Sequence, residues 1–251
     1  MNARLTISAI LITKDEDKNI ADCLSTLKFC DEIVIVDCGS SDRTVDIARD
    51  LGAKVHISED WPGFGIQKQR TLDLAICDWV LSIDADERIP EGLKREIETA
   101  ITDSRHCGYR LNRLSWFLGQ PMRHGGWYPD RIVRLARREK AHFTPDVVHE
   151  ALLVEGEIGQ LHEPIIHYSY RTIDDVMRKM HQYALASAES RRRDGRAGGL
   201  PVAITRSSFS FFNAYVLRAG LLDGARGFVA AVAKAQETFW RYLATGWEKP
   251  S

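Results

Sequence analysis

The sequence predicts an α/β protein with a mostly parallel sheet, helices on both faces of that sheet and a helical C-terminal extension. Short runs rich in β-branched and other apolar residues recur at 5–12, 32–37, 53–57 and 79–84, as expected for buried strands. The segments between these runs carry apolar residues at three- and four-residue spacing, which is the period of a helix. Strands that alternate with helices typically form a parallel sheet covered on both faces.

Two helices are predicted between the first three strands. Their apolar positions are Ile20, Cys23, Leu24 and Leu27 in the first, and Val45, Ile47, Ala48 and Leu51 in the second. Gly52 directly follows the second helix, and glycine is the residue that most often ends a helix. The first 57 residues therefore predict β-α-β-α-β order.

The rest of the chain changes in character. Residues 105–170 mix aromatic side chains with glycines and prolines, and contain strand-like runs at 131–135 and 164–168, so we expect loops that build a binding pocket. The last third is helical in pattern, with a glycine-rich break at 195–199. After this break, two aromatic-rich helical faces are flanked by arginines, which is typical of helices that lie in a membrane interface.

The composition is that of an ordinary soluble globular protein, with 44% hydrophobic and 27% charged residues. No run reaches the roughly 18 apolar residues of a membrane-spanning helix, and no signal peptide is recognisable. The five cysteines are odd in number and form no C-x-x-C pair, which suits a reducing compartment. We therefore expect a cytoplasmic protein without structural zinc.

The net charge of −1 conceals an asymmetry along the chain. Residues 1–100 carry 12 basic and 20 acidic side chains, a net charge of −8, whereas residues 188–251 carry 10 basic and 5 acidic ones, a net charge of +5. The acidic N-terminal part suits a metal or catalytic site, and the basic C-terminal part suits an anionic partner such as a phospholipid surface. Solvated charge without a partner explains the same asymmetry.

Polar side chains follow three of the predicted strands. Thr13, Asp37 and Asp84 stand at the carboxyl ends of these strands, and in an open parallel sheet such ends share one ligand crevice. Asp84 and Asp86 flank Ala85, so both carboxylates can face one ligand. Mg²⁺ and Mn²⁺ bind through one or two carboxylates and substrate phosphates. A solvated acidic turn is the alternative for this pair.

Asp37 is placed to accept a hydrogen bond from a ribose hydroxyl or a base N–H, as acidic residues at strand ends do in other nucleotide-binding sheets. Asp42, further along the same turn, is predicted to cap the next helix. The dinucleotide fingerprint is absent, because Gly63 and Gly65 lack a third glycine and do not directly follow a strand. The nucleotide is therefore not expected to be NAD.

Six segments, taken in order and spacing, carry a resemblance to a known family. They are ILITKDEDKNI, IVIVDCGSSDRT, GFGIQKQRTL, WVLSIDADE, WYPDRIVRL and VVHEAL. The chain resembles the family 2 inverting glycosyltransferases of the GT-A fold, and most closely the bacterial lipopolysaccharide-core β-glucosyltransferase group. This resemblance implies a catalytic domain at 1–195, with a nucleotide-sugar half at 1–100 and an acceptor half at 101–195. Residues 196–251 are then an amphipathic, membrane-associating extension.

The resemblance also implies roles for individual residues. The donor-binding residues are Thr13, Lys14, Glu16, Asp37, Lys68 and Asp84, and the metal ligands are Asp86 and Asp84. Asp15, Cys38 and Gln69 stand where the family usually has asparagine, serine and asparagine, which leaves the donor open. Simple exposed charge remains the alternative for Lys14 and Lys68.

An inverting displacement needs a general base for the acceptor hydroxyl. We expect Glu150 in this role, with Asp130 as the second candidate unless its carboxylate only pairs with Arg131 or Arg134. His149 is a third metal ligand or orients Glu150, unless it is a packed core histidine.

The expected function is transfer of a sugar from a nucleotide-diphosphate donor such as UDP-glucose to a glycan or lipid-linked glycan, with Mg²⁺ or Mn²⁺ bound. The resemblance places this reaction in lipopolysaccharide-core or related envelope biosynthesis, on the cytoplasmic side of the membrane. No nucleic-acid partner is expected. The alternatives are a nucleotidyltransferase or phosphotransferase that uses the same carboxylates, and a non-enzymatic module that binds membranes through its C-terminus.

Overall fold

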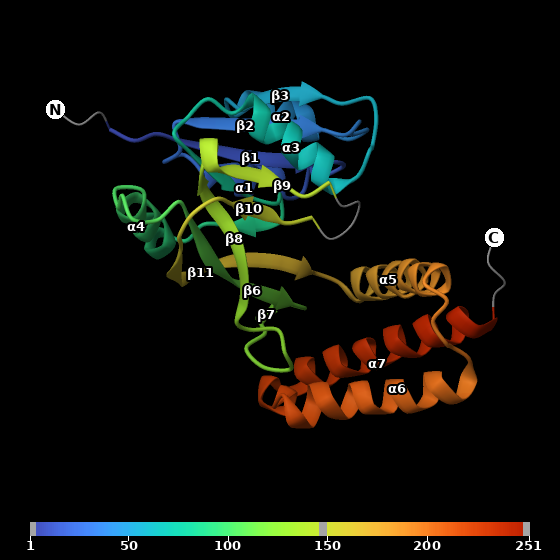
Figure 1. The fold of residues 1–251 in the computed structure, drawn as a ribbon. Coiled ribbons are helices and arrows are strands. Elements are labelled where there is room, and N and C mark those ends of the chain that lie inside the picture. Colours follow the sequence, from blue (N-terminus) through green and yellow to red (C-terminus); the bar gives the residue numbers. More distant parts are fainter. Residues whose placement is uncertain (1–3, 146–149, 248–251) are drawn as a thin grey trace. The chain divides into compact units, whose positions relative to one another are not determined.

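The computed structural model describes residues 4–145 and 150–247 (Figure 1). The chain divides into two compact units. One comprises Met1–Arg113 and Asp130–His167, and the other comprises Leu114–Pro129 and Tyr168–Ser251. Each unit is described by itself. The expected domain boundary at residue 195 remains a prediction.

The first four strands form the parallel part of the sheet, as predicted. They are β1 (Ile7–Thr13), β2 (Glu32–Asp37), β3 (Lys54–Ile57) and β4 (Trp79–Ser82). Their spatial order is β3-β2-β1-β4, and every pairing among them is parallel. In the register of β1 and β2, Thr13 lies opposite Asp37. The two carboxyl-end residues are therefore neighbours.

The later strands extend the sheet, with antiparallel pairing of β8 to β4 and β6, of β7 to β6 and of β5 to β11. These strands are β5 (Glu87–Arg88), β6 (Gly108–Phe117), β7 (Gln120–Pro121), β8 (Asp130–Arg137) and β11 (Ile158–Tyr170). The sheet continues from β4 in the order β8-β6-β11-β5, with β7 paired to β6. The predicted runs at 131–135 and 164–168 lie inside β8 and β11, which are both longer than expected. A separate pair is formed by β9 (Ala141–Phe143) and β10 (Leu152–Val154).

Helices cover both faces of the parallel strands. Four of them belong to this unit, namely α1 (Ile20–Ser25), α2 (Thr44–Asp50), α3 (Phe64–Leu74) and α4 (Glu91–Ala100). Successive residues of a strand point to opposite faces, and β1 shows the consequence. Ala9 and Leu11 join one buried cluster with residues of α1 and α4, whereas Ile10 joins a second with Leu72 of α3. The predicted fold class is confirmed.

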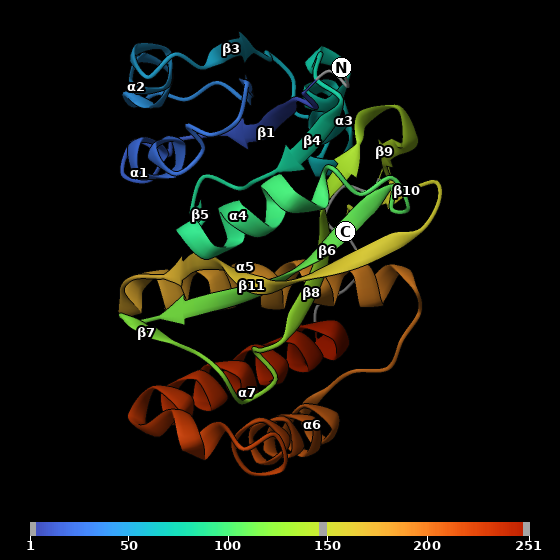
Figure 2. The same ribbon diagram turned by 90° about the vertical axis from the view of Figure 1, so that its left-hand side faces the viewer.

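The second unit is mainly helical. It contains α5 (Ile173–Arg193), α6 (Leu200–Phe212), η2 (Asn213–Leu217), η3 (Gly220–Asp223) and α7 (Gly224–Trp247). Figures 1 and 2 show α6 and α7 side by side, and α5 also packs against α7. Thr172 and Asp175 form a reciprocal capping box at the start of α5, which satisfies backbone donors that the first turn leaves free. Among the described helices, none is long and apolar enough to cross a membrane.

Candidate active site

Thr13 and Asp37 form one side of the candidate crevice. The Thr13 hydroxyl donates to Asp37 Oδ2 at 2.8 Å, and the backbone N–H groups of Gly39 and Ser40 donate to Asp37 Oδ1 at 3.1 and 2.8 Å. The Ser40 hydroxyl adds a bond of 2.6 Å to Oδ2. The buried Asp37 carboxylate therefore holds the turn after β2 in place. Its predicted hydrogen bond to a nucleotide would have to be added to these bonds or replace one of them.

The loop after β1 is tied to the same turn. Asp15, in the left-handed region at φ +53°, accepts from the backbone N–H of Ser41 at 2.8 Å. The Glu16 carboxylate accepts from the Asn19 side chain at 2.6 Å, and Lys14 is exposed. The structure thus places Lys14 and Glu16 beside the turn, but shows no direct contact that defines their predicted roles. Burial raises the pKa of the Cys38 thiol to about 11, so this cysteine is neutral at pH 7.

A second cluster surrounds Asp84, just beyond the end of β4. Lys68 Nζ lies 3.0 Å from Asp84 Oδ1 and 2.8 Å from Glu150 Oε1, so one buried ammonium joins two predicted site residues. Arg134 Nη2 lies 2.5 Å from Asp84 Oδ2. Lys68 and Arg134 expose only 8% and 7% of their side chains, whereas Asp84 exposes 31%. Asp84 is therefore the partly exposed member of this cluster, and its carboxylate is held by two buried cations.

Arg134 was expected only as a partner of Asp130, and no role of its own was predicted for Glu87. Glu87 is fully buried, accepts from the Asp84 backbone N–H at 2.9 Å and lies 2.9 Å from Arg134 Nη2. Glu87 thus bonds to the backbone at the start of the Asp84–Glu87 turn and to Arg134 at its end. Their detectable signal was weak, because an arginine in a strand and a third acid after the D-x-D are both common on protein surfaces.

Asp130 has a different partner from the one expected. Its carboxylate lies 2.7 Å from Arg113 Nη2 and accepts from Arg113 Nε at 2.9 Å, whereas Arg134 is committed to Asp84 and Glu87. The expected pairing with Arg131 or Arg134 is therefore wrong. Arg131, the next residue along β8, points to the opposite face of the sheet, whereas Arg113 lies opposite Asp130 on the paired strand β6.

Burial and the two cations move the pKa values of this cluster in opposite directions. Burial alone would raise the pKa of Asp84, but the charges of Arg134 and Lys68 outweigh it and hold that pKa well below its usual value. Burial raises the pKa of Glu87, and the nearby Asp84 carboxylate adds to this rise while Arg134 opposes it. Asp84 is therefore the more readily ionised acid of the pair.

The lowered pKa of Asp84 predicts a pH-dependent contribution to stability. Because the folded state binds its proton less readily than the unfolded chain, this contribution is complete above the unfolded pKa of about 3.9 and is lost as pH falls toward the folded value. At pH 7, Asp84→Asn should lower the free energy of unfolding by about 1–2 kcal/mol. Urea unfolding should show this difference shrinking between pH 5 and pH 2, and a constant difference would contradict the assignment.

Asp86 pairs with His167, whereas Asp84 pairs with Lys68 and Arg134. Asp86 Oδ2 and His167 Nε2 are 3.3 Å apart, and the two side chains are 22% and 15% exposed. β5 and β11 bring them together, since His167 pairs with Glu87 in the sheet register. His167 lies about 80 residues after Asp86 in the sequence, so nothing local points to this contact. His149, the predicted third ligand, lies outside the described residues.

The pair Asp86 and His167 fits a divalent cation that also binds a substrate diphosphate. Mn²⁺ accepts carboxylate and imidazole ligands together, and Mg²⁺ is commonly held by one or two carboxylates plus phosphates. Within residues 4–145 and 150–247, no group of three or more His, Cys, Asp or Glu side chains is arranged around a metal position. Asp86 and His167 are the two side chains of this pair that would hold such an ion.

The predicted aromatic residues of the acceptor region lie in the second unit. The Trp127 ring packs 5.6 Å from Phe117 and 5.9 Å from Tyr170, measured between ring centroids. Arg123 lies 6.0 Å from the centre of the Tyr128 ring. Trp127 is thus part of a packed aromatic cluster, which is the alternative to stacking on a sugar.

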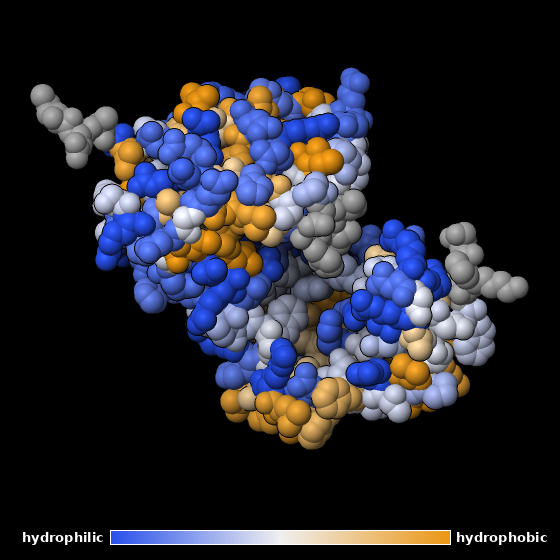
Figure 3. Space-filling model, viewed as in Figure 1, coloured by the Kyte–Doolittle hydropathy of each residue, from blue (hydrophilic) through white to orange (hydrophobic). Residues whose placement is uncertain are grey.

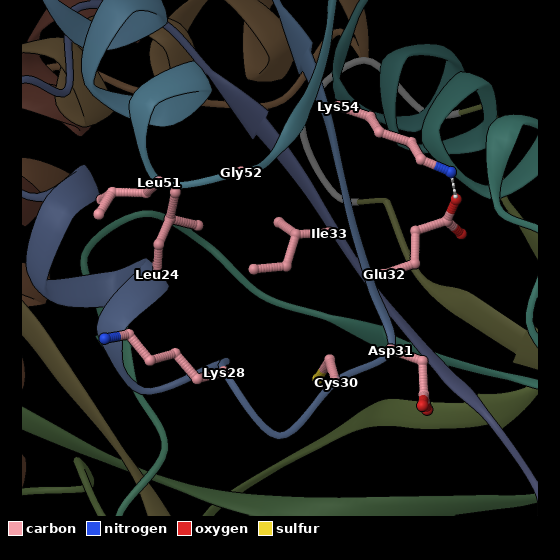
Figure 4. A pocket seen from close by; sticks show the side chains of 9 residues that line it. All are labelled: Leu24, Lys28, Cys30, Asp31, Glu32, Ile33, Leu51, Gly52 and Lys54. Carbon is pink, nitrogen blue, oxygen red and sulfur yellow. Dashed lines mark hydrogen bonds and ion pairs between the residues drawn. The ribbon is translucent and has the colours of Figure 1, made fainter.

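Figure 4 shows a cavity of about 300 Å³ in the first unit, lined by residues of α1 and of the starts of β2 and β3. Lys54 and Glu32 pair across its edge at 2.6 Å. These residues lie at the amino ends of β2 and β3, whereas Asp37 ends β2 at its carboxyl side. The cavity is therefore separate from the candidate crevice.

These features bring acidic and basic side chains together at the carboxyl ends of the parallel strands of an α/β fold. Residues 8–151 match the model of the family described as Glycosyl transferase family 2. This match covers more than half of the chain, and the chain belongs to that family of GT-A enzymes. The resemblance inferred from the six sequence segments is confirmed.

Individual proteins similar to this chain include two glycosyltransferases and one solved structure. A glycosyltransferase of Rickettsia conorii is 31% identical, over 96% of this chain and 90% of the relative. The lipopolysaccharide core biosynthesis glycosyltransferase LpsC of Rhizobium meliloti is 28% identical, over 95% of this chain and 91% of the relative. A crystal structure of S. aureus TarS 1-349 has a TM-score of 0.49 and 16% identity, over 96% of this chain and 90% of that chain.

Proposed function

We propose that the protein is an inverting hexosyltransferase that moves a sugar from a UDP-hexose such as UDP-glucose to a glycan acceptor of the lipopolysaccharide core. The observation that carries this proposal is the Lys68 ammonium, which holds the carboxylates of Asp84 and Glu150 together. The similarity to LpsC, a lipopolysaccharide core biosynthesis glycosyltransferase, supports the choice of acceptor.

Asp86 and His167 are proposed to hold a Mg²⁺ or Mn²⁺ ion. When bound, such an ion supplies Lewis-acid stabilisation of the departing nucleoside diphosphate. Asp84 is proposed to face the ribose, because Lys68 and Arg134 hold its carboxylate in a fixed position. Thr13 and Asp37 shape the part of the crevice proposed for the nucleobase, with Lys14 and Glu16 at its edge.

Glu150 is proposed to remove the proton from the acceptor hydroxyl. The hydroxyl oxygen then forms a bond to the anomeric carbon from the face opposite the leaving group. The bond between that carbon and the diphosphate oxygen breaks, and UDP departs with the electron pair. Because Glu150 is 15% exposed and rests 2.8 Å from Lys68, its carboxylate is positioned before the acceptor arrives. Asp130, 38% exposed and bound by Arg113, is the second candidate for the base.

The metal assignment predicts a loss of donor binding on substitution of Asp86. In Asp86→Ala, the Mn²⁺-dependent part of UDP affinity should fall by about tenfold or more, since a charged ligand to a cation is removed. Isothermal titration with UDP, in Mn²⁺ and in EDTA, measures this effect. His167→Ala should weaken the same Mn²⁺-dependent part.

Asp50→Ala provides the matched control, because Asp50 is an exposed aspartate at the end of α2. Its UDP affinity should equal that of the unmodified protein in both buffers. An Asp86→Ala protein that keeps the full Mn²⁺ enhancement would exclude Asp86 as a ligand.

We further propose that the enzyme acts at the cytoplasmic face of a membrane, where a lipid-linked glycan would be presented. Support comes from the net charge of +5 over residues 188–251, which would favour an anionic surface. Residues 196–251 remain the proposed membrane-associating segment.

A further inference from the structure

An apolar surface projects where α6 is joined to α7. Between 43% and 63% of each contributing residue is exposed. We call this set the apolar tip, and it consists of Phe212, Val216, Leu217, Leu221 and Leu222. Figure 3 shows the corresponding hydrophobic surface at the end of the hairpin that contains η2 and η3. Five large apolar side chains on one short connection form a contiguous patch, unlike isolated surface leucines.

The tip is a firmly built turn. Gly220 approaches the Ala214 carbonyl so closely that an added Cβ would lie 2.6 Å from its oxygen. The buried Asp223 carboxylate accepts from the His124 backbone N–H at 2.9 Å and lies 2.8 Å from His124 Nδ1. Tight backbone packing and this buried anchor hold the connection in place. The leucines are therefore presented outward by a defined backbone.

The charges around the tip are predominantly positive. Residues 200–247 contain five basic and two acidic side chains. The acidic ones are internally engaged: Asp223 is buried against His124, and Glu237 pairs with Lys234 and Arg241. Arg206, Arg218 and Arg226 are exposed on the two helices and their connection. An apolar patch with an excess of arginines is complementary to an anionic lipid surface.

We propose that the apolar tip inserts its leucines into the interface of an anionic bilayer while the neighbouring arginines meet the lipid headgroups. This inference deepens the proposed function, on which it rests for the idea of a lipid-linked acceptor. Within residues 196–251, the membrane contact is thereby assigned to the apolar tip and its neighbouring arginines. No described helix is apolar and long enough to span the bilayer, so the contact is interfacial.

Flotation with vesicles tests the apolar part of the proposal. Full-length protein should float with vesicles of phosphatidylcholine and phosphatidylglycerol. Because each tip leucine would leave water on binding, Leu217→Ser and Leu222→Ser should each lower the partition coefficient by about tenfold. Ile76→Ser is the matched control, since Ile76 is 71% exposed in the other unit, and it should float like the unmodified protein.

Substituting the arginines tests the electrostatic part. Arg206→Gln and Arg218→Gln should each weaken binding to anionic vesicles by about fivefold, and pure phosphatidylcholine vesicles should bind poorly. Raising the salt concentration should weaken anionic binding further, because salt screens these charges. Equal binding to neutral and anionic vesicles would overturn the anionic assignment.

Two further readouts separate this proposal from the proposed function. Slow hydrolysis of UDP-glucose in solution reports the active site, and it should be unchanged in the leucine variants. Normal hydrolysis without flotation would overturn the membrane contact alone, whereas flotation without hydrolysis of any nucleotide sugar would overturn only the proposed function. If the leucine substitutions abolish a dimer seen by light scattering and leave flotation unchanged, the tip binds a second copy and the proposal is wrong.

Discussion

Replacing Glu150 by glutamine is expected to lower sugar transfer by about 10² to 10⁴-fold, the usual contribution of a general base. Glutamine keeps the shape of the side chain but cannot accept the proton of the acceptor hydroxyl. UDP affinity should stay within about threefold, since Glu150 contacts the protein through Lys68 and is proposed to act on the acceptor alone. Transfer kinetics and UDP titration on the same preparation separate the two effects.

Two matched variants make this experiment decisive. Glu155→Gln changes an exposed glutamate just after β10 and should leave transfer unaffected. Asp130→Asn should reduce transfer far less than Glu150→Gln if Glu150 is the base. Full transfer by Glu150→Gln together with a large loss in Asp130→Asn would move the base to Asp130.

Replacing Arg134 by methionine is expected to destabilise the fold by about 3–5 kcal/mol, the usual result of leaving a buried charge without its partner. Methionine fills much of the same volume, but the fully buried Glu87 loses its ion pair and Asp84 loses the 2.5 Å contact. The already raised pKa of Glu87 would rise further, because protonation relieves part of the cost. Urea unfolding at pH 7 measures the difference.

Arg131→Met is the control for this prediction, because Arg131 is exposed on the same strand. It should change the free energy of unfolding by no more than about 0.5 kcal/mol. Combining Glu87→Gln with Arg134→Met should recover part of the lost stability, since Glu87→Gln removes the carboxylate that Arg134→Met leaves unpaired. Equal stability of the Arg134→Met and Arg131→Met proteins would show that the buried ion pair does not support the site.

The parallel half of the fold was predictable because its signals are local. The runs at 33–36 and 79–81 consist of apolar residues alone, as is typical of strands buried on both faces. Strand-end position also explains why Thr13 and Asp37 were correctly expected to lie together. The later strands have weaker local signals, and only parts of β8 and β11 were predicted. β6 and β11 alternate buried and exposed positions irregularly, and their pairing depends on contacts distant in sequence.

The same distinction explains the site. Asp84 and Asp86 were predicted to act together because both closely follow β4, at one strand end. Arg134 and His167 reach that strand end from β8 and β11, about 50 and 80 residues later in the chain. Only the sheet order brings them close. A sequence pattern cannot state which of several arginines in DRIVRLARR will be buried, whereas the strand register decides it.

The most direct test of the proposed metal-dependent sugar transfer is the release of UDP from UDP-glucose by protein freed of metal with EDTA. Hydrolysis should be absent in EDTA and should appear on addition of Mn²⁺ or Mg²⁺, with UDP-glucose turned over faster than GDP- or dTDP-glucose. Equal release of UDP in EDTA and in excess Mn²⁺ would show that the reaction does not depend on a metal ion, which would contradict the proposal.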